Sequence, residues 1–434
     1  MQFIINKVKT GFLLKSFFSG GTSSLLKLLS GLILVKGIAI IGGPEGMAVS
    51  GTFLNVAQLA QTFATAGISL GVIRYISSNI GVDTTAYKLY LGNSIGLTLI
   101  FSTSCALMII GSSPWLALAV FGTMGQFYYF IILGIGAFFY GMNNFLFTYY
   151  SAHQLHRQYL FFNIINSSAG MLFTLAMLFF FGMRGAFVSI ALHQSIGFLL
   201  YGFNRVFVLW QNELKKQFQL QWGASKKLLS YSIYLLENIV IISVVQLLTR
   251  SLLIAHHGAD TAGLWDGMSR ISSSYITASI SIILIYFIPR FSKGSLGQCK
   301  QILLKQGAIF IGIIGASFLT LYVFRGPVVG ILFSEAFGPV EKLFPYFLIG
   351  DLCRIFGYLI TTIFISRKNL TVAIVSDIIF NALLLYCMQY LLIPQGGLTG
   401  VGEAYLFTYV AYMLVMMFYF LVSSKNALKQ MDAS

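Results

Sequence analysis

Residues 89–111 read LYLGNSIGLTLIFSTSCALMIIG and contain no charged side chain. A helix that crosses a bilayer needs about 20 consecutive, mostly apolar residues, and this stretch is long enough. Similar stretches recur along the whole chain of 434 residues, of which 57% are hydrophobic and 9% are charged. Because a soluble domain carries about 25% charged residues, the composition indicates a membrane protein.

The apolar stretches define the fold class. In lipid, backbone groups are satisfied only within helices or closed barrels, and these runs are too long and too uniformly apolar for barrel strands. We therefore predict an all-α integral membrane protein with twelve transmembrane helices. The predicted spans are 12–41, 47–72, 89–111, 124–148, 159–181, 186–208, 229–255, 262–289, 306–324, 344–365, 370–392 and 400–423. The spacings Gly67-x-x-x-Gly71 and Gly92-x-x-x-Gly96 would allow close packing of helices.

The basic residues predict the orientation of the chain. If the N-terminus is cytoplasmic, 19 of the 27 Lys and Arg residues fall in cytoplasmic segments, and only Arg184, Arg325 and Lys342 fall in outside loops. Cytoplasmic loops of membrane proteins are enriched in Lys and Arg. The net charge of +15 therefore indicates a membrane topology rather than nucleic-acid binding. We expect a multi-pass protein of the bacterial inner membrane with both termini in the cytoplasm.

The longest predicted cytoplasmic loop divides the chain into two halves of six spans. We predict an N-terminal lobe at 1–210, a cytoplasmic linker at 211–228 and a C-terminal lobe at 229–434. Many transporters are built from such repeats. The two halves show no clear similarity in sequence, so the repeat is inferred from the topology alone.

The chain lacks the common motifs of enzymes. It has no G-x-x-x-x-G-K-[ST] phosphate loop, no H-E-x-x-H zinc motif and no C-x-x-C pair. The predicted outside loops are short and leave little room for an active site. We therefore predict a transporter rather than an enzyme, with no catalytic residues, no metal site and no cofactor.

Ten ionisable residues fall inside the predicted spans. A charge at the centre of a bilayer costs about 2.5–3.5 kcal/mol even on the most lenient scale, so such residues face a bundle interior or an aqueous cavity. The cations lie mostly from the middle of the membrane outward, a position that favours an anionic substrate. The ten residues are Lys27, Lys36, Glu237, Arg250, Asp266, Arg270, Asp351, Arg354, Asp377 and Glu403.

Two pairs of these residues have the spacing of neighbours on a helix. Asp266 and Arg270 are four residues apart, and Asp351 and Arg354 are three apart, so each pair could close a local ion pair. Either the two charges only neutralise each other, or the Arg is available to an anion while the Asp tunes it. Lys27 has no acidic residue within four positions and needs another helix, water or substrate as its partner.

The remaining charged residues allow more than one interpretation. Lys36 and Glu403 lie close enough to a span end to reach the headgroups. Glu237 and Asp377 lie toward the cytoplasmic side, where they could tune charge or couple an ion. His193, next to Gln194 in the middle of a span, is either a proton relay or a hydrogen-bonded core residue.

Five short motifs resemble the Wzx-type polysaccharide flippases of the multidrug/oligosaccharidyl-lipid/polysaccharide exporter superfamily. They are GGPEG at 42–46, AGISLGVIRYI at 66–76, GLWDGMSRIS at 263–272, YFIP at 286–289 and GDLCR at 350–354. Their order and spacing extend the resemblance over nearly the whole chain. Within these proteins the likeness is strongest to the flippases of enterobacterial common antigen synthesis.

This resemblance implies a fold and an activity. The fold would be that of MATE and MurJ-like proteins, with two six-helix lobes in a V around a central cavity. The activity would be the transfer of an undecaprenyl-diphosphate-linked oligosaccharide, of O-antigen or common-antigen type, from the cytoplasmic to the periplasmic leaflet by alternating access. Lys27, Arg250 and Arg270 match cationic cavity residues of the family, and Arg354 adds a fourth cation near mid-membrane. Relatives often carry a basic or neutral residue where this chain has Asp266.

The implied partners are the lipid-linked oligosaccharide, membrane lipids, a polysaccharide polymerase and a chain-length regulator, without nucleic acid. Three other functions are compatible with a chain of this kind. A drug or cation antiporter of the same superfamily would favour acidic cavity residues, whereas the cations dominate here. A membrane polymerase of the polysaccharide pathway would need a large outside loop, and a structural membrane protein would not need ten charges within its spans.

Overall fold

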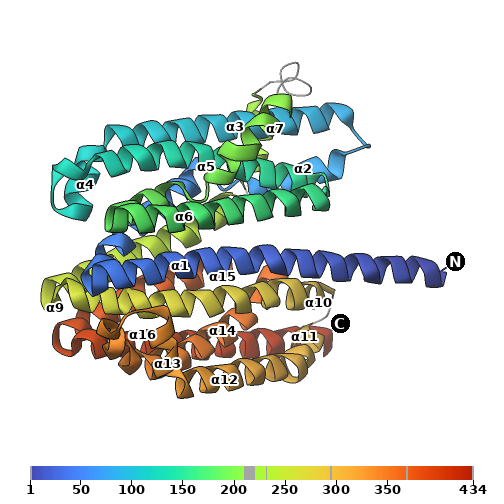
Figure 1. The fold of residues 1–434 in the computed structure, drawn as a ribbon. Helices are drawn as coiled ribbons and strands as arrows, with labels where there is room; N and C mark the ends of the chain where they lie inside the picture. Colours follow the sequence, from blue (N-terminus) through green and yellow to red (C-terminus); the bar gives the residue numbers. More distant parts are fainter. Residues whose placement is uncertain (1, 210–219, 231, 294–295, 368–369, 433–434) are drawn as a thin grey trace. The chain divides into compact units, whose positions relative to one another are not determined.

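The computed structural model describes residues 2–209, 220–230, 232–293, 296–367 and 370–432. Every regular element that these residues form is a helix (Figure 1). The elements up to residue 230 are α1 (Gln2–Ala64), α2 (Ser69–Asn79), α3 (Thr84–Gly111), α4 (Ser113–Phe121), η1 (Met124–Gln126), α5 (Tyr128–Ala152), α6 (His156–Leu192), η2 (Phe198–Gly202), α7 (Phe203–Leu209) and α8 (Trp222–Leu229).

The later elements follow in the same all-helical manner. They are α9 (Ser232–Ile282), η4 (Ile283–Phe287), α10 (Ile288–Lys293), α11 (Leu296–Ile302), η5 (Leu303–Gly307), α12 (Ala308–Val323), α13 (Arg325–Leu332), η6 (Glu335–Leu343), α14 (Phe344–Ser366), α15 (Leu370–Ser376), η7 (Asp377–Leu384) and α16 (Leu385–Asp432). Four of the short η elements, η2, η4, η5 and η7, are π-helical.

Four of the longest helices are interrupted by glycines with left-handed backbone angles. In the described residues, eight helical stretches are long and apolar enough to cross a membrane. Four of these stretches contain a glycine with positive φ at Gly43, Gly182, Gly258 or Gly397. L-residues with a side chain rarely adopt this conformation. Division at the four glycines gives twelve helical segments, which follow the twelve predicted spans in order.

The described chain forms two compact units. Unit 1 comprises Met1–Ile41 and Thr52–Val240, and unit 2 comprises Gly42–Gly51 and Ile241–Ser434. The predicted lobe boundary at 211–228 falls partly on residues 211–219, which lie outside the described residues. The rest of that predicted linker includes α8, which belongs to unit 1.

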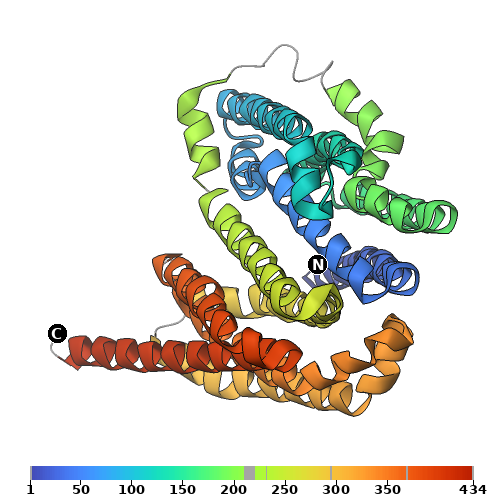
Figure 2. The same cartoon turned by 90° about the vertical axis from the view of Figure 1, so that its left-hand side faces the viewer.

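Unit 1 is organised around α3, α5 and α6, which Figure 2 shows close to end-on. Its core is apolar and aromatic, with Phe145, Leu146 and Phe162 at most 3% exposed. Buried Asn93 fixes α8 to this core, because its Oδ1 accepts hydrogen bonds from the Gln221 amide at 3.0 Å and the Ser225 hydroxyl at 2.8 Å. A helix that the sequence analysis assigned to a linker is therefore part of a packed unit.

Glycine allows close packing in both units. Gly67 has φ 60° and lies in the turn between α1 and α2. A Cβ atom there would lie 3.4 Å from the Cα atom of Ser232, where α9 begins, so this glycine serves both a chain turn and a close contact. In unit 2, α14 approaches α16 at two glycines. A Cβ atom at Gly350 would lie 2.9 Å from the ring of Tyr405, and one at Gly357 would lie 2.5 Å from the ring of Tyr412. Small residues at these positions let the large rings pack against the helix backbone.

Candidate functional site

Arg250 and Asp266 form a buried, two-pronged ion pair in unit 2. The Arg250 Nε donates to Asp266 Oδ2 at 2.9 Å, and its Nη2 donates to Asp266 Oδ1 at 2.6 Å. Arg250 is 2% exposed and Asp266 is 5% exposed. The guanidinium also lies 5.7 Å from the ring of Trp265. Such bidentate pairs fix the geometry of both groups.

The pair depends on the reversal of α9 at Gly258. Arg250 and Asp266 are 16 positions apart, a separation of about 24 Å along a straight helix. Gly258 has φ 83° and lies midway between them. The left-handed residue turns the chain back, so the two side chains meet across the hairpin.

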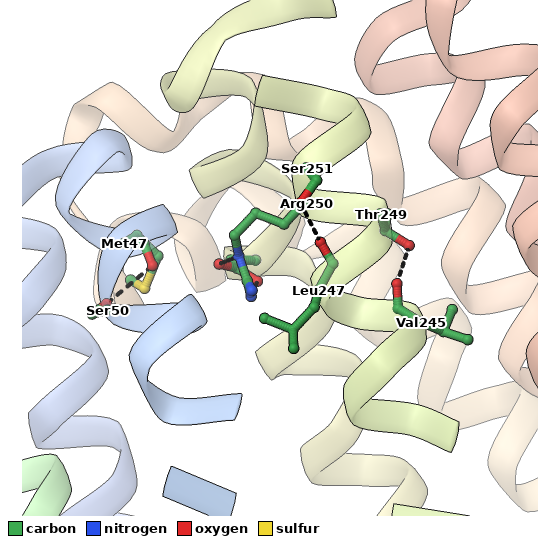
Figure 3. A network of polar contacts seen from close by, with 8 residues as sticks. Met47, Ser50, Val245, Leu247, Thr249, Arg250 and Ser251 are labelled. Carbon is green, nitrogen blue, oxygen red and sulfur yellow. Dashed lines mark hydrogen bonds and ion pairs between the residues drawn. The ribbon is translucent and has the colours of Figure 1, made fainter. Parts of the chain in front are cut away.

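The segment Gly42–Gly51, which contains the Gly-Pro-Glu-Gly motif, packs against this pair within unit 2. In Figure 3 the Arg250 side chain extends from α9 toward the helical segment that carries Met47 and Ser50. A Cβ atom at Gly51 would lie 2.7 Å from Arg250 Nη2 and still closer to the Asp266 carboxylate. The ion pair therefore fits beside this helix only because Gly51 has no Cβ atom.

Arg270 adds a second guanidinium one helical turn beyond Asp266. Among the described residues, ion pairs join Arg250 to Asp266 and Arg325 to Glu341, so the suggested local pair of Asp266 with Arg270 is not formed. The Nη2 of Arg270 and the Nη1 of Arg250 are buried and meet no hydrogen-bond acceptor among the described residues. Two guanidiniums and one carboxylate leave one net positive charge, with N–H groups available to an anion.

Asp351 also has partners other than the one suggested by sequence. Its carboxylate accepts hydrogen bonds from the hydroxyls of Ser272 at 2.7 Å, Tyr275 at 2.5 Å and Tyr405. Asp351 is fully buried, and three O–H donors supply the stabilisation that a buried carboxylate requires. The local ion pair with Arg354 is absent from the ion pairs of the described residues.

A chain of polar contacts links Arg354 to Asp377. Arg354 Nη1 donates to the Tyr405 hydroxyl at 3.2 Å, and the guanidinium lies 4.9 Å from the ring of Tyr409. The Tyr409 hydroxyl donates to Asn381 Oδ1 at 2.7 Å, and Asn381 Nδ2 donates to Asp377 Oδ1 at 2.8 Å. Two predicted residues are thus joined through tyrosine and asparagine side chains that the sequence analysis did not select.

The other predicted residues fall in unit 1 or at the edges of unit 2. Glu237 belongs to unit 1 and is half-buried. Lys27 lies in the first part of α1, and its side chain is outside what the structure describes. Lys36 is exposed and Glu403 is half-buried. His193 also belongs to unit 1, where its Nδ1 lies 2.8 Å from the carbonyl of Ser189.

Comparisons with known proteins identify relatives of the same kind. No protein-family model matches the chain. The lipid III flippases of Escherichia coli (strain K12) and Shigella flexneri are each 24% identical over 410 residues, which is 93% of this chain and 97% of theirs. An inward-facing multidrug resistance MATE family transporter of the MOP superfamily has a TM-score of 0.78, with 16% identity over 93% of this chain and 96% of that chain.

The chain is an all-α, multi-pass membrane protein with the fold of the multidrug/oligosaccharidyl-lipid/polysaccharide exporter (MOP) superfamily. The predicted fold class and the resemblance to this superfamily are confirmed. Its curated relatives carry the name of a flippase and its structural neighbour that of a transporter, so the chain resembles transport proteins rather than enzymes. The Wzx type within the superfamily stays a prediction.

Proposed function

We propose that this chain is a flippase for an undecaprenyl-diphosphate-linked oligosaccharide of O-antigen or common-antigen type. It would move the lipid from the cytoplasmic to the periplasmic leaflet of the bacterial inner membrane by alternating access. Arg250 and Arg270 carry the proposal, because each guanidinium keeps a buried N–H group without an acceptor among the described residues. The lipid III flippase of Escherichia coli, which matches over nearly the whole chain, supports a lipid-linked substrate.

The cations have the chemistry that a diphosphate needs. A diphosphate that leaves water loses its hydration shell, and guanidinium groups replace that shell with paired, charge-assisted hydrogen bonds. In this proposal Arg250, Arg270, Lys27 and Arg354 bind the head group while the polyprenyl tail stays in lipid. Asp266 holds Arg250 in its orientation by the two-pronged pair.

In this proposal the carboxylates do not contact the substrate but set the charge around its binding site. Asp351, Glu237 and Asp377 are proposed to tune the charge of the interior or to couple transport to an ion. A polysaccharide polymerase and a chain-length regulator are the partners expected for a protein of this pathway. Membrane lipids are the remaining partners, because they would surround the spans.

A drug or cation antiporter is the alternative within the same superfamily. Its binding site would present carboxylates to a cationic substrate. In unit 2, Asp266 is already paired with Arg250, and Asp351 accepts three hydroxyl donors. These two acids are therefore satisfied within the protein, which favours an anionic substrate.

Complementation tests the proposal. The chain is expressed in strains that each lack one flippase, and both surface glycan and membrane abundance are measured. Arg270→Ala should abolish most glycan at normal abundance, because a charge-assisted contact is worth about 1.5–3 kcal/mol, or about ten- to hundredfold in affinity. Arg270→Lys should retain part of the activity. Arg325→Ala, at an exposed ion pair, is the matched control and should keep full glycan.

Two results would refute this assignment. Full glycan with Arg270→Ala at normal abundance would remove the cation from the transport path. The second result is that Arg270→Ala lowers the amount of folded protein, while the neutral variant Arg270→Met restores both abundance and glycan. The positive charge would then not be needed for transport.

The orientation is part of the same proposal. Both termini and the segment around 211–227 are expected in the cytoplasm, because of the distribution of Lys and Arg. Reporter fusions at Lys429 and within 211–227 should both report a cytoplasmic location. A periplasmic signal from either fusion would contradict the twelve-span topology.

A further inference from the structure

Unit 1 contains a polar cavity whose described lining includes none of the charged residues discussed above. The cavity has a volume of about 410 Å³, within the range of about 300–1,000 Å³ typical of small-molecule sites. Its walls come from α1, α5, α6 and the turn that follows α6. The residues that matter below are Asn144, Phe147, Tyr159, Asn166, His193 and Gln194.

The lining of this cavity contains no Asp, Glu, Lys or Arg among the described residues. Its polar groups are amides, hydroxyls and one imidazole, which offer both donors and acceptors. Asn143 Nδ2 donates to the Gln194 carbonyl at 2.8 Å and to Asn166 Oδ1 at 3.4 Å. These contacts orient Asn166, and they leave its Nδ2 without a described partner.

The imidazole of His193 is also oriented by the protein. Its Nδ1 lies 2.8 Å from the carbonyl oxygen of Ser189, and a carbonyl can only accept. The Nδ1 atom therefore carries a proton, and in the neutral form of the ring Nε2 is an acceptor. Two further polar atoms of the lining, Asn143 Oδ1 and Ser167 Oγ, are buried without a partner among the described residues.

Aromatic rings complete the cavity. The rings of Phe147 and Tyr159 lie 5.4 Å apart in an edge-to-face arrangement, and both line the cavity. The face of an aromatic ring is negative and attracts C–H groups, which carry a partial positive charge. The cavity thus combines neutral hydrogen-bonding groups with ring faces.

This combination matches one class of ligand better than the others. A phosphate would need a cation, and a cationic drug would need a carboxylate; the described lining has neither. A purely apolar ligand would leave the amides and the imidazole unpaired, at a cost in binding. A sugar ring has hydroxyls that donate and accept in all directions and a C–H face that can stack on a ring.

We propose that this cavity binds a neutral sugar residue of the transported head group. The inference rests on the proposed flippase function and deepens it, because it assigns a site for the sugar part of the substrate within unit 1. Gln194, Asn166, His193 and the hydroxyl of Tyr159 hydrogen-bond the hydroxyl or acetamido groups of the sugar, and the ring of Phe147 stacks on its C–H face.

The experiment measures sugar binding directly. The full chain is placed in lipid nanodiscs, and saturation-transfer difference NMR is recorded with free N-acetylglucosamine, glucose and galactose as neutral probes and glycerol as the background. We expect saturation transfer to at least one neutral sugar above the glycerol level. Tyr159→Phe and Gln194→Leu, which each remove one hydrogen-bonding group, should weaken the apparent affinity by about two- to tenfold.

Two matched variants provide the control. Tyr90→Phe and Gln61→Leu make the same chemical changes at buried positions of unit 1 outside the cavity, and they should leave the binding unchanged. Absence of saturation transfer to all three sugars in the wild type would overturn the inference. Equal weakening by the control pair and the cavity pair would overturn it too.

The same variants separate this inference from the flippase proposal. Arg270→Ala should keep sugar binding while it loses glycan in the complementation assay. Complementation by the wild type without sugar binding would leave the flippase function standing and refute the cavity. Sugar binding without complementation of any strain would leave the sugar site standing and refute the flippase function.

Discussion

The hairpin at Gly182 in unit 1 and the hairpin at Gly397 in unit 2 are built in the same way. Gly182 has φ 56° and ψ −131°, and Gly397 has φ 54° and ψ −123°. Three residues after each, a second glycine packs against the helical segment that precedes the turn. A Cβ atom at Gly185 would overlap the carbonyl of Met177, and one at Gly400 would overlap the carbonyl of Leu392. Both hairpins thus use a G-x-x-G sequence in the same geometry.

Other connections repeat in the same order. Gly43 and Gly258 each interrupt the first long helix of a half. The connection after α3 holds a short α-helix and a 3₁₀-helix, α4 and η1, and the connection after α12 holds the same two, α13 and η6. The same order of elements thus recurs in the two halves of the described chain, and the division into two six-helix lobes stays a prediction.

The interiors of the two units differ in chemistry. Unit 1 has a cavity lined by neutral amides, hydroxyls and rings, whereas unit 2 buries Arg250, Asp266 and Asp351. A repeated scaffold can therefore keep its glycine turns while its internal side chains change freely. The two interiors therefore suit ligand groups of different charge.

The largest loss of stability is expected when the buried ion pair of unit 2 is broken. Arg250→Ala should destabilise the protein by about 3–5 kcal/mol, because it leaves the Asp266 carboxylate buried without its partner. The measurement is the melting temperature and membrane abundance by fluorescence-detected size-exclusion chromatography. The double variant Arg250→Met with Asp266→Leu should recover abundance but not glycan. Normal stability of Arg250→Ala would show that unit 2 does not depend on the pair.

The second test concerns the repeated hairpins. Gly185→Ala and Gly400→Ala should each destabilise the protein by about 1–3 kcal/mol, because the new methyl group meets a backbone carbonyl. Gly312→Ala is the control, since a Cβ atom there meets nothing within 4 Å, and it should be neutral or stabilising by up to about 1 kcal/mol. Thermal unfolding of the three purified variants decides the comparison. If only one hairpin variant is destabilised, the two turns are not equivalent.

The third test concerns the tyrosine between Asp351 and Arg354. Tyr405→Phe removes a hydroxyl that donates to the carboxylate and accepts from the guanidinium. The loss should cost about 1–3 kcal/mol, because the buried Asp351 and the half-buried Arg354 each have one partner fewer. Tyr419→Phe, near the end of α16, is the matched control and should be neutral. Unfolding in urea measures both, and equal midpoints would contradict the network.

The smallest effect is expected at the exposed ion pair. Arg325 and Glu341 lie 3.6 Å apart with 36% and 39% of their side chains exposed, and such pairs contribute about 0–1 kcal/mol. Arg325→Ala should therefore change the melting temperature little, and high salt should change it as little in the wild type. If Arg325→Ala lowered the melting temperature as much as Arg250→Ala does, the expected difference in stability between exposed and buried ion pairs would be wrong.

The sequence predicted the spans because long apolar runs have few alternatives in lipid. It did not predict that Arg250 pairs with Asp266, because that contact depends on the reversal at Gly258 rather than on helical spacing. Arg250 and Asp266 are each eight positions from Gly258, and this equal spacing could have indicated their contact. The contact between Asp377 and Asn381 could also have been predicted, since the two residues are four positions apart on one helix.

The hydroxyl partners of Asp351 could not be predicted in this way. Tyr275 comes from α9 and Tyr405 from α16, and a sequence of 23 tyrosines gives no means to select these two. The cavity of unit 1 was equally hidden, because its Asn and Gln side chains carry no charge that would mark them within an apolar span.

The packing of Gly42–Gly51 within unit 2 has a consequence for biosynthesis. The Pro44 carbonyl packs so closely on Gly263 that a Cβ atom there would overlap it. Residue 263 leaves the ribosome about 219 residues after residue 44, which takes about 10–40 s at about 5–20 residues per second. During that interval the Gly-Pro-Glu-Gly segment lacks its neighbour at Gly263, so its final packing can form only after all of unit 1 has been synthesised.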